Sequence, residues 1–339
     1  MFLGTFLARA VARAGQPIRW LAAPQPRLER LIGLELGPAD RTALASALEA
    51  DGARLGHYYA WYLEKLLVAR RVRRGSRAEM LRFVRSTDAT NLQAVDRAIS
   101  HGSGTVLALP HYGHYILCAV SLIMHIGETR DVGIFYGEPG THRGNEVFDR
   151  LYEALFKDRS PNVHVYHSNR QGMAGALRLL KAGGVLIMMP DVHQKRDEAF
   201  AIPFLGLSLD VMLGTAALAR KTGSALIPIL PLGKGAMRFR TRVGRPVNTG
   251  HIVADADADA GGNQRECFLD YAATCAVFDR YQRWMSGTCI QWQYVREHFA
   301  RRAPFVELAP DVVERIWNDF LNDPRVRGHD AKAFRLPLE

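Results

Sequence analysis

The chain has 339 residues, of which 48% are hydrophobic, so it can form a sizeable core and is not globally disordered. Its length allows one large α/β domain with helical additions, or two domains. Lysine and arginine outnumber aspartate and glutamate by 44 to 34, which gives a formal net charge of +10 and predicts an anionic partner. Nucleic acid, an anionic membrane and an acidic carrier or coenzyme would all fit that charge.

The stretch Met1 to Gly15 has the pattern of an amphipathic helix. Arg9 and Arg13 flank its apolar face, where they can reach lipid phosphates. That face is formed by Leu3, Phe6, Leu7, Ala10, Val11 and Ala14. The helix lies either on a membrane or on the protein's own core, and the sequence favours neither. There is no cleavable signal peptide and no apolar run of about 18 residues, so a membrane-spanning helix is not expected.

Residues 38–86 have a helical pattern throughout. Asp40 can cap a helix that ends near Ala50, and residues 53–69 repeat aromatic and leucine side chains at i, i+3, i+4 spacing. A dense basic group follows, formed by Arg70, Arg71, Arg73, Arg74, Arg77, Arg82 and Arg85. This arginine cluster predicts a surface for a membrane or an acidic partner. No nucleic-acid-binding motif accompanies it, so nucleic acid is not expected as a partner.

Beyond residue 86, apolar strands alternate with helices of ten to fifteen residues. The strands are expected at 105–109, 132–136, 163–166, 185–189, 226–232 and 237–243, and the helices at 87–100, 113–126, 143–157, 170–181 and 209–222. Residues 203–206 are expected to be an irregular loop. The alternation predicts an α/β fold with a mainly parallel central sheet flanked by helices. The expected organisation is a helical N-terminal region (1–86), an α/β core (87–250), and a loop with C-terminal helices (251–339).

The organising stretch of the core is the strand at 105–109, which breaks at Pro110. This break delivers His111 into the first turn of the next helix, at the carboxyl end of the strand, where open α/β sheets bind ligands. His111 is either a core residue or a catalytic group. If it is catalytic, it should face a cleft together with Asp191, which follows a later strand.

Other chemistries are poorly supported by the sequence. His111-x-x-His114 and His164-x-x-His167 lack a third ligand at a recognised metal-site spacing, so no metal is expected. There is no Gly-x-Ser-x-Gly nucleophile motif and no complete dinucleotide-binding motif. Four irregularly spaced cysteines (Cys118, Cys267, Cys275 and Cys289) form neither a zinc pattern nor a disulfide framework, which favours a reduced, cytosol-facing compartment.

Four short motifs then occur in a characteristic order. They are segments 109–115 (Leu-Pro-His-Tyr-Gly-His-Tyr), 186–194 (Leu-Ile-Met-Met-Pro-Asp-Val-His-Gln), 202–206 (Ile-Pro-Phe-Leu-Gly) and 218–228 (Leu-Ala-Arg-Lys-Thr-Gly-Ser-Ala-Leu-Ile-Pro). With these motifs, residues 91–243, and more loosely the whole chain, resemble the lysophospholipid acyltransferase superfamily. The chain is most similar to its lipid A biosynthesis (lauroyl and myristoyl) branch.

The resemblance implies an enzyme that moves an acyl chain from a thioester to a hydroxyl or amine, with His111 as general base. Asp191 is the second catalytic candidate, because of its position at the end of a later strand. It also implies a set of residues that bind substrate. These candidates are Tyr112, Gly113, His114, Tyr115, Glu138, Arg143, His193 and Gln194. No cofactor or metal is implied, because an acyl carrier protein or acyl-coenzyme A serves as co-substrate.

One departure from the family is important. Its signature is His-x4-Asp or His-x4-Glu, and the acidic position is Ile116 here. Three explanations are open. Asp191 or Glu138 orients His111 instead; or an amine acceptor needs a weaker base; or the chain is a catalytically silent scaffold that binds acyl chains or acyl carriers.

The expected partners follow from the resemblance and the charge together. They are an acyl carrier protein or acyl-coenzyme A, a lipid or amphiphilic acceptor, and an anionic membrane surface. The expected location is peripheral, at the cytoplasmic face of the inner membrane, or otherwise in the cytoplasm.

Overall fold

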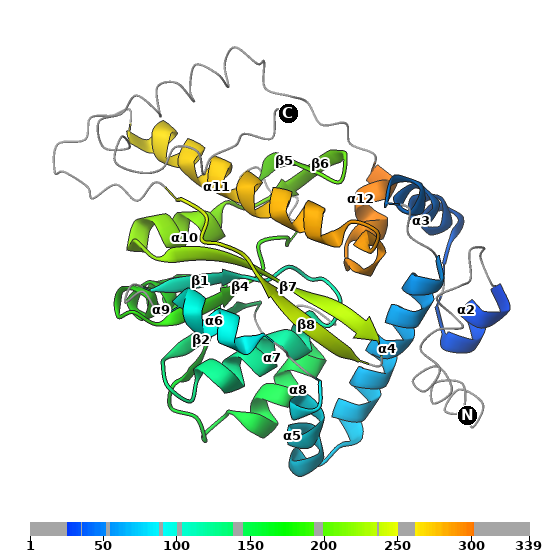
Figure 1. The fold of residues 1–339 in the computed structure, drawn as a ribbon, viewed down its shortest axis with the longest axis horizontal. Coiled ribbons are helices and arrows are strands. Elements are labelled where there is room, and N and C mark those ends of the chain that lie inside the picture. The colour runs from blue at the N-terminus through cyan, green and yellow to red at the C-terminus, as the bar shows by residue number, and fades with distance from the viewer. Residues whose placement is uncertain are drawn as a thin grey trace.

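The computed structural model of the chain describes residues 26–34, 36–51, 55–87, 91–99, 104–137, 145–192, 199–235, 237–249 and 262–301. Its centre is a six-stranded sheet in the order β3-β2-β4-β1-β7-β8, in which β7 and β8 pair antiparallel and the other neighbours are parallel (Figure 1). The strands are β1 (Thr105–Ala108), β2 (Val132–Tyr136), β3 (Val163–His167), β4 (Val185–Met188), β7 (Ala225–Gly235) and β8 (Arg238–Val243). The predicted α/β fold with a mainly parallel sheet is confirmed.

Helices cover both faces of this sheet. Leu107 and Ile187 point to a core shared with α5 (Arg77–Arg85), α6 (Leu92–Ile99), α7 (Tyr115–Ile126) and α8 (Glu146–Leu155). Their chain neighbours Val106 and Leu186 point to the opposite core, shared with α9 (Arg170–Lys181), α10 (Gly214–Thr222) and α11 (Gly262–Met285). Figure 1 shows α7 and α8 on one side of the sheet and α10 and α11 on the other. Because both faces are covered, the central strands β1 and β4 are buried at every position and are mostly apolar, which made them recognisable in the sequence.

Helical additions at both ends pack onto the second of these cores. They comprise α3 (Pro38–Asp51), α4 (Leu55–Arg74), the 3₁₀-helix η2 (Cys289–Gln291) and α12 (Val295–Arg301), and α2 (Pro26–Ile32) is connected to α4 by the hydrogen bond that the Tyr59 hydroxyl donates to Glu29. Leu44 of α3, Tyr59 of α4 and Val295 of α12 are all buried in it. In the described ranges, no helix is long and apolar enough to cross a membrane. The amphipathic helix predicted for residues 1–15 and the chain after residue 301 lie outside the described residues.

Two local predictions are wrong. Residues 203–206 were expected to be an irregular loop and 209–222 a helix, but β5 (Phe200–Phe204) and β6 (Leu207–Val211) form an antiparallel hairpin, and α10 begins at Gly214. The turn residues Leu205 and Gly206 both have positive φ, at 51° and 76°, as a tight two-residue hairpin requires. The period-two burial of Leu209 and Val211 is the signal that identifies this strand.

Candidate active site

His111 lies in the turn between β1 and α7, at the carboxyl end of a central strand. Helix α7 begins at Tyr115, and His111 precedes it. The prediction that His111 lies in the first turn of this helix is therefore wrong. β1 is flanked by the parallel strands β4 and β7, and the Oη–H of Tyr281 in α11 donates a hydrogen bond of 2.6 Å to the carbonyl of Ala108. The end of β1 is therefore held by its two neighbouring strands and by α11.

Asp191 is brought to His111 by the pairing of β1 with β4. The last paired residues are Ala108 and Met188, and the backbone N–H of Leu109 continues the ladder to the carbonyl of Met188 at 2.8 Å. His111 and Asp191 each lie three residues beyond this pair. Because parallel strands in register end at the same edge of a sheet, the two side chains meet there.

The carboxylate of Asp191 accepts three hydrogen bonds, each 2.8 Å long. Its Oδ1 accepts from Nδ1 of His111, and its Oδ2 accepts from the backbone N–H of His111 and from Nε1–H of Trp292. The side chain of Asp191 is 1% exposed and that of His111 is 14% exposed. Asp191 thus fixes the tautomer in which Nδ1 carries the proton, and this leaves Nε2 of His111 as a proton acceptor.

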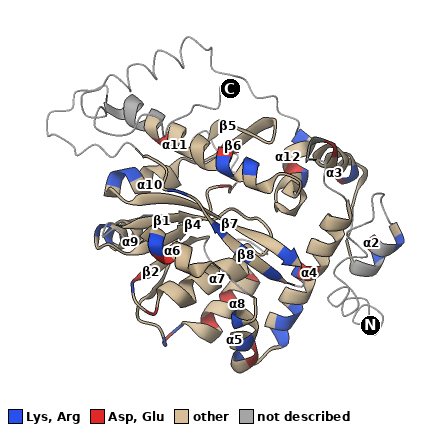
Figure 2. Cartoon of the chain, viewed as in Figure 1, with Lys and Arg blue, Asp and Glu red and all other residues tan. Residues whose placement is uncertain are grey.

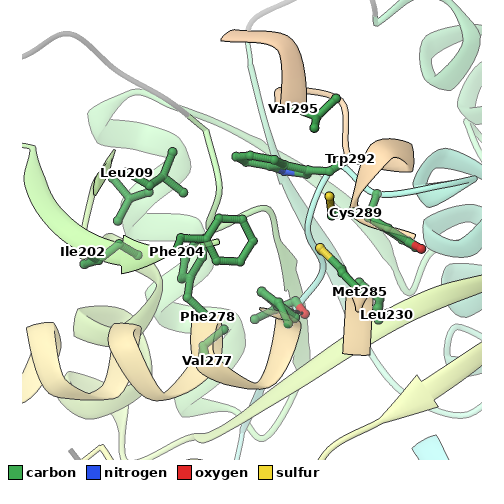
Figure 3. Packing of buried hydrophobic residues seen from close by; sticks show 14 of the residues in the cluster. Ile202, Phe204, Leu209, Leu230, Val277, Phe278, Met285, Cys289, Trp292 and Val295 are labelled. Atoms are coloured by element: carbon green, nitrogen blue, oxygen red, sulfur yellow. Dashed lines mark hydrogen bonds between the residues drawn. The ribbon is translucent and has the colours of Figure 1, made fainter. Parts of the chain in front are cut away.

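Trp292 is a site residue that the sequence analysis did not identify. Its ring packs edge-on against Phe204, with ring centres 5.0 Å apart, in the apolar cluster of Figure 3. Its backbone forms an antiparallel bridge with Tyr112, and the next residue, Gln293, donates its N–H to the carbonyl of His111 at 2.9 Å. The core packing of Trp292 therefore positions the indole N–H that holds Asp191.

A cavity of about 1120 Å³ opens beside His111. Part of its wall is apolar and comes from α7, β2, α8, α9 and β4; the side chains are Ile116, Ala119, Ile134, Phe148, Met173 and Met188. Polar groups also line it, among them Asn145, Ser168, Arg170, Gln293 and Arg301. A cavity with a large apolar wall and a few polar groups is suited to an amphiphilic ligand.

Two tyrosines flank the imidazole inside this cavity. The ring centres of Tyr115 and Tyr294 lie 4.7 and 5.3 Å from that of His111, both in edge-on orientation. Burial, with the charge of Asp191 as a further cause, raises the pKa of Tyr115 and of Tyr294 well above the usual value for tyrosine. Both hydroxyl groups therefore stay protonated and can act as donors.

Of the predicted substrate-binding residues, Tyr115 lines the cavity, whereas Tyr112, Gly113 and His114 do not. The Tyr112 hydroxyl donates to Oγ1 of Thr288 at 2.7 Å. The Gly113 carbonyl accepts from Nε1–H of Trp61 at 3.1 Å, and Nε2 of the buried His114 lies 2.8 Å from Oε2 of Glu64. These three residues are thus engaged in packing beside the cavity, and their predicted role in substrate binding stays a prediction.

The remaining predicted positions divide into two groups. Ile116 lines the cavity and packs against the core around α7. The carboxylate that contacts His111 in the structure is that of Asp191. Glu138, Arg143, His193 and Gln194 lie outside the described residues.

Comparison with known proteins agrees with the motifs. The sequence model of the bacterial lipid A biosynthesis acyltransferases matches residues 60–252, which is more than half of the chain and includes both His111 and Asp191. No curated protein matches the chain. The match begins within α4 and ends after β8, so it contains the whole central sheet. The chain therefore belongs to the family of bacterial lipid A biosynthesis acyltransferases.

Proposed function

We propose that this protein transfers an acyl chain from a thioester donor to a hydroxyl or amine of a lipid or amphiphilic acceptor, with His111 as general base. Membership of the family supports acyl transfer to a lipid acceptor. The observation that carries the rest is the geometry of His111 and Asp191. A cavity-lining imidazole, held through Nδ1 by a buried carboxylate, is the arrangement that general-base catalysis requires.

The proposed reaction proceeds in two steps. Nε2 of His111 takes the proton from the acceptor O–H or N–H as the acceptor atom attacks the thioester carbonyl carbon. The carbonyl electron pair moves to oxygen and gives a tetrahedral oxyanion, while Asp191 stabilises the imidazolium. When the oxyanion collapses, the carbon–sulfur bond breaks and the leaving thiolate takes the proton from His111. The products are an ester or amide and a free thiol.

The contact between His111 and Asp191 supports the first of the three explanations for Ile116. An orienting acid need not come from the helix that follows the histidine, because a neighbouring strand can deliver it. The second explanation, an amine acceptor, is not required, since a complete dyad can serve either acceptor. A catalytically inactive scaffold is not favoured either, because two hydrogen-bond donors besides the imidazole hold Asp191 in place.

The arginine cluster supports an acidic donor or an anionic membrane as the partner. Its seven side chains, Arg70 to Arg85, are all exposed on α4 and α5. Figure 2 shows blue segments on both helices. Arg73 contacts Glu146 at 3.3 Å, and Glu146 follows Asn145, which lines the cavity. An acyl carrier protein, acyl-coenzyme A or anionic lipids at the cytoplasmic face of the membrane would all be attracted to this surface.

Product analysis tests the proposal directly. The purified protein is incubated with acyl carrier protein and coenzyme A thioesters and with a panel of lipid alcohols and amines, and products are identified by mass spectrometry. We expect one acylated acceptor, and its loss in His111→Ala. His125→Ala is the matched control, because His125 also pairs with an aspartate, Asp96, but lies at the far end of α7. Binding of donors without transfer to any acceptor would instead establish a silent scaffold.

A further inference from the structure

We propose that the hydroxyl groups of Tyr115 and Tyr294 form the oxyanion-binding site of this enzyme. This inference rests on the proposed function, since it concerns the tetrahedral intermediate of the same reaction. The ligand of the site is the negatively charged oxygen that develops from the thioester carbonyl. Neither tyrosine has the role of general base, which belongs to His111.

The placement of the two rings is the first argument. Tyr115 comes from the first residue of α7 and Tyr294 from the segment between η2 and α12, and both rings contact the imidazole edge-on. The substrate carbonyl must lie close to Nε2 of His111, because the acceptor that attacks it gives its proton to that nitrogen. Tyr115 and Tyr294 line the same cavity and their rings pack against His111, so their hydroxyl groups are candidates to contact the reacting carbonyl.

The second argument is that neither hydroxyl has a hydrogen-bond partner among the described residues. The other tyrosines packed near the site do have one: Tyr112 donates to Thr288, Tyr136 to the carbonyl of Asn145 at 3.0 Å, and Tyr281 to the carbonyl of Ala108. Both side chains are half-buried at the cavity and are not sealed in the core. Their hydroxyl groups are therefore available to donate to a substrate that binds beside His111.

Electrostatics provides the third argument. The charge of Asp191 raises the pKa of both tyrosines, and the pKa of Tyr294 is raised further by Tyr115, so the two hydroxyls and the carboxylate lie within electrostatic range of one another. The hydroxyls are held protonated at neutral pH and can only donate to an anion. A hydrogen-bond donor that is already in position before the reaction can stabilise an oxyanion without a cost for reorganising the site.

Tyr115→Phe and Tyr294→Phe each remove one oxygen and keep the aromatic packing. We expect each variant to lower kcat on the order of 10²-fold with little change in KM, because the contact is made only to the oxyanion. Tyr271→Phe is the matched control. It removes a hydroxyl that donates to the carbonyl of Ala201, outside the cavity, and it should leave both constants close to those of the parent.

A second measurement does not depend on turnover. Two ligands are titrated into the same variants. One is an alkyl phosphonate analogue of the tetrahedral intermediate, and the other is an unreactive thioether analogue of the donor. The proposal expects the tyrosine variants to bind the phosphonate at least tenfold more weakly and the thioether equally well. Thermal unfolding of each variant confirms that it is folded.

Three results would overturn the proposal. The first is unchanged kcat in both tyrosine variants while His111→Ala is inactive, which leaves the proposed function standing. The second is a raised KM with unchanged kcat, which would make the tyrosines acceptor-binding groups. The third is a parent protein that transfers to no acceptor, in which case the proposed function and the oxyanion site fail together.

Discussion

The histidines of two histidine–carboxylate pairs lie three residues apart in this protein. The two pairs have the same contact distance but differ in exposure and in their surroundings. His111 contacts Asp191 and His114 contacts Glu64, both at 2.8 Å. The side chain of His111 is 14% exposed and lines the cavity, whereas that of His114 is 4% exposed and does not line it. The same interaction is thus found once at a cavity and once inside the packing behind it.

The source of each carboxylate explains the difference. Asp191 comes from the strand next to β1, so it lies at the edge of the sheet where ligands bind. Glu64 comes from α4, whose Trp61 also donates to the carbonyl of Gly113. α4 therefore holds the turn that carries His111, and the pair at His114 is part of that support. A short histidine–carboxylate distance therefore does not by itself identify a catalytic pair, and His111 is proposed as the base because its side chain also lines the cavity.

The sharpest way to test this comparison is to remove each histidine in turn. We expect His111→Ala to abolish transfer while the unfolding temperature and donor binding stay close to those of the parent, because the side chain acts as a base at a cavity wall. His114→Ala should retain transfer in the folded fraction but lower stability. Product formation and thermal unfolding measure both effects. Rapid transfer by His111→Ala would show that the histidine mechanism is wrong.

Removing the charge of Asp191 tests the partner of the first pair. Asp191→Asn should lower kcat on the order of 10⁴-fold by analogy with the serine protease triad, because an amide does not stabilise the imidazolium and favours the wrong tautomer. The fold should persist, since the amide oxygen can still accept from Trp292. Steady-state kinetics and circular dichroism provide the measurements. A loss of less than tenfold would mean that another group orients His111.

Breaking the second pair should affect stability rather than chemistry. Glu64→Ala leaves His114 buried without its carboxylate, and we expect the free energy of unfolding to fall by about 3 to 5 kcal/mol. Glu64→Gln, which can still accept a hydrogen bond at this position, should lose much less. Urea unfolding measures both variants. If instead kcat falls strongly in a stably folded Glu64→Gln protein, the second pair takes part in catalysis.

The position of the missing family acid offers a smaller test. Ile116→Glu should not raise turnover, because Nδ1 of His111 already donates to Asp191 and a second carboxylate cannot take that proton. Turnover should fall modestly, since a charged group replaces part of the apolar wall. Ile116→Gln is the control of similar size without charge. Faster transfer to alcohols in the glutamate variant would show that the family acid still has a role here.

The arginine cluster on α4 and α5 contrasts with the buried N-terminal half of α4. Reversing charges in this cluster should have the smallest effect of these tests. Arg74→Glu with Arg82→Glu should weaken sedimentation with anionic vesicles a few-fold at low salt, and the difference should shrink at high salt. Arg178→Glu with Lys181→Glu on α9 changes the net charge equally and is the control. Equal binding by both variants would mean that the arginine cluster serves another partner.

Much of the fold follows from local sequence patterns. The segments around β1, β2 and β4 are apolar because both faces of a parallel sheet are buried, and helix α9 was predicted with its observed limits, Arg170–Lys181. The β5–β6 hairpin was missed because residues 203–206 were expected to be an irregular loop and residues 209–211 the start of the following helix. In this segment, the alternation of Leu207, Leu209 and Val211 was the better signal.

The sequence by itself determined that His111 and Asp191 end buried strands, and it placed both at the carboxyl edge of the sheet. Strand order is not a local property, so only the tertiary structure decided that β4 lies next to β1 and that these two residues form a pair. The same holds for Trp292 and Glu64, which lie 101 and 50 residues away in the sequence from their partners Asp191 and His114. Such contacts depend on how packed layers meet, because hydrogen bonds across a core leave no periodic trace in the chain.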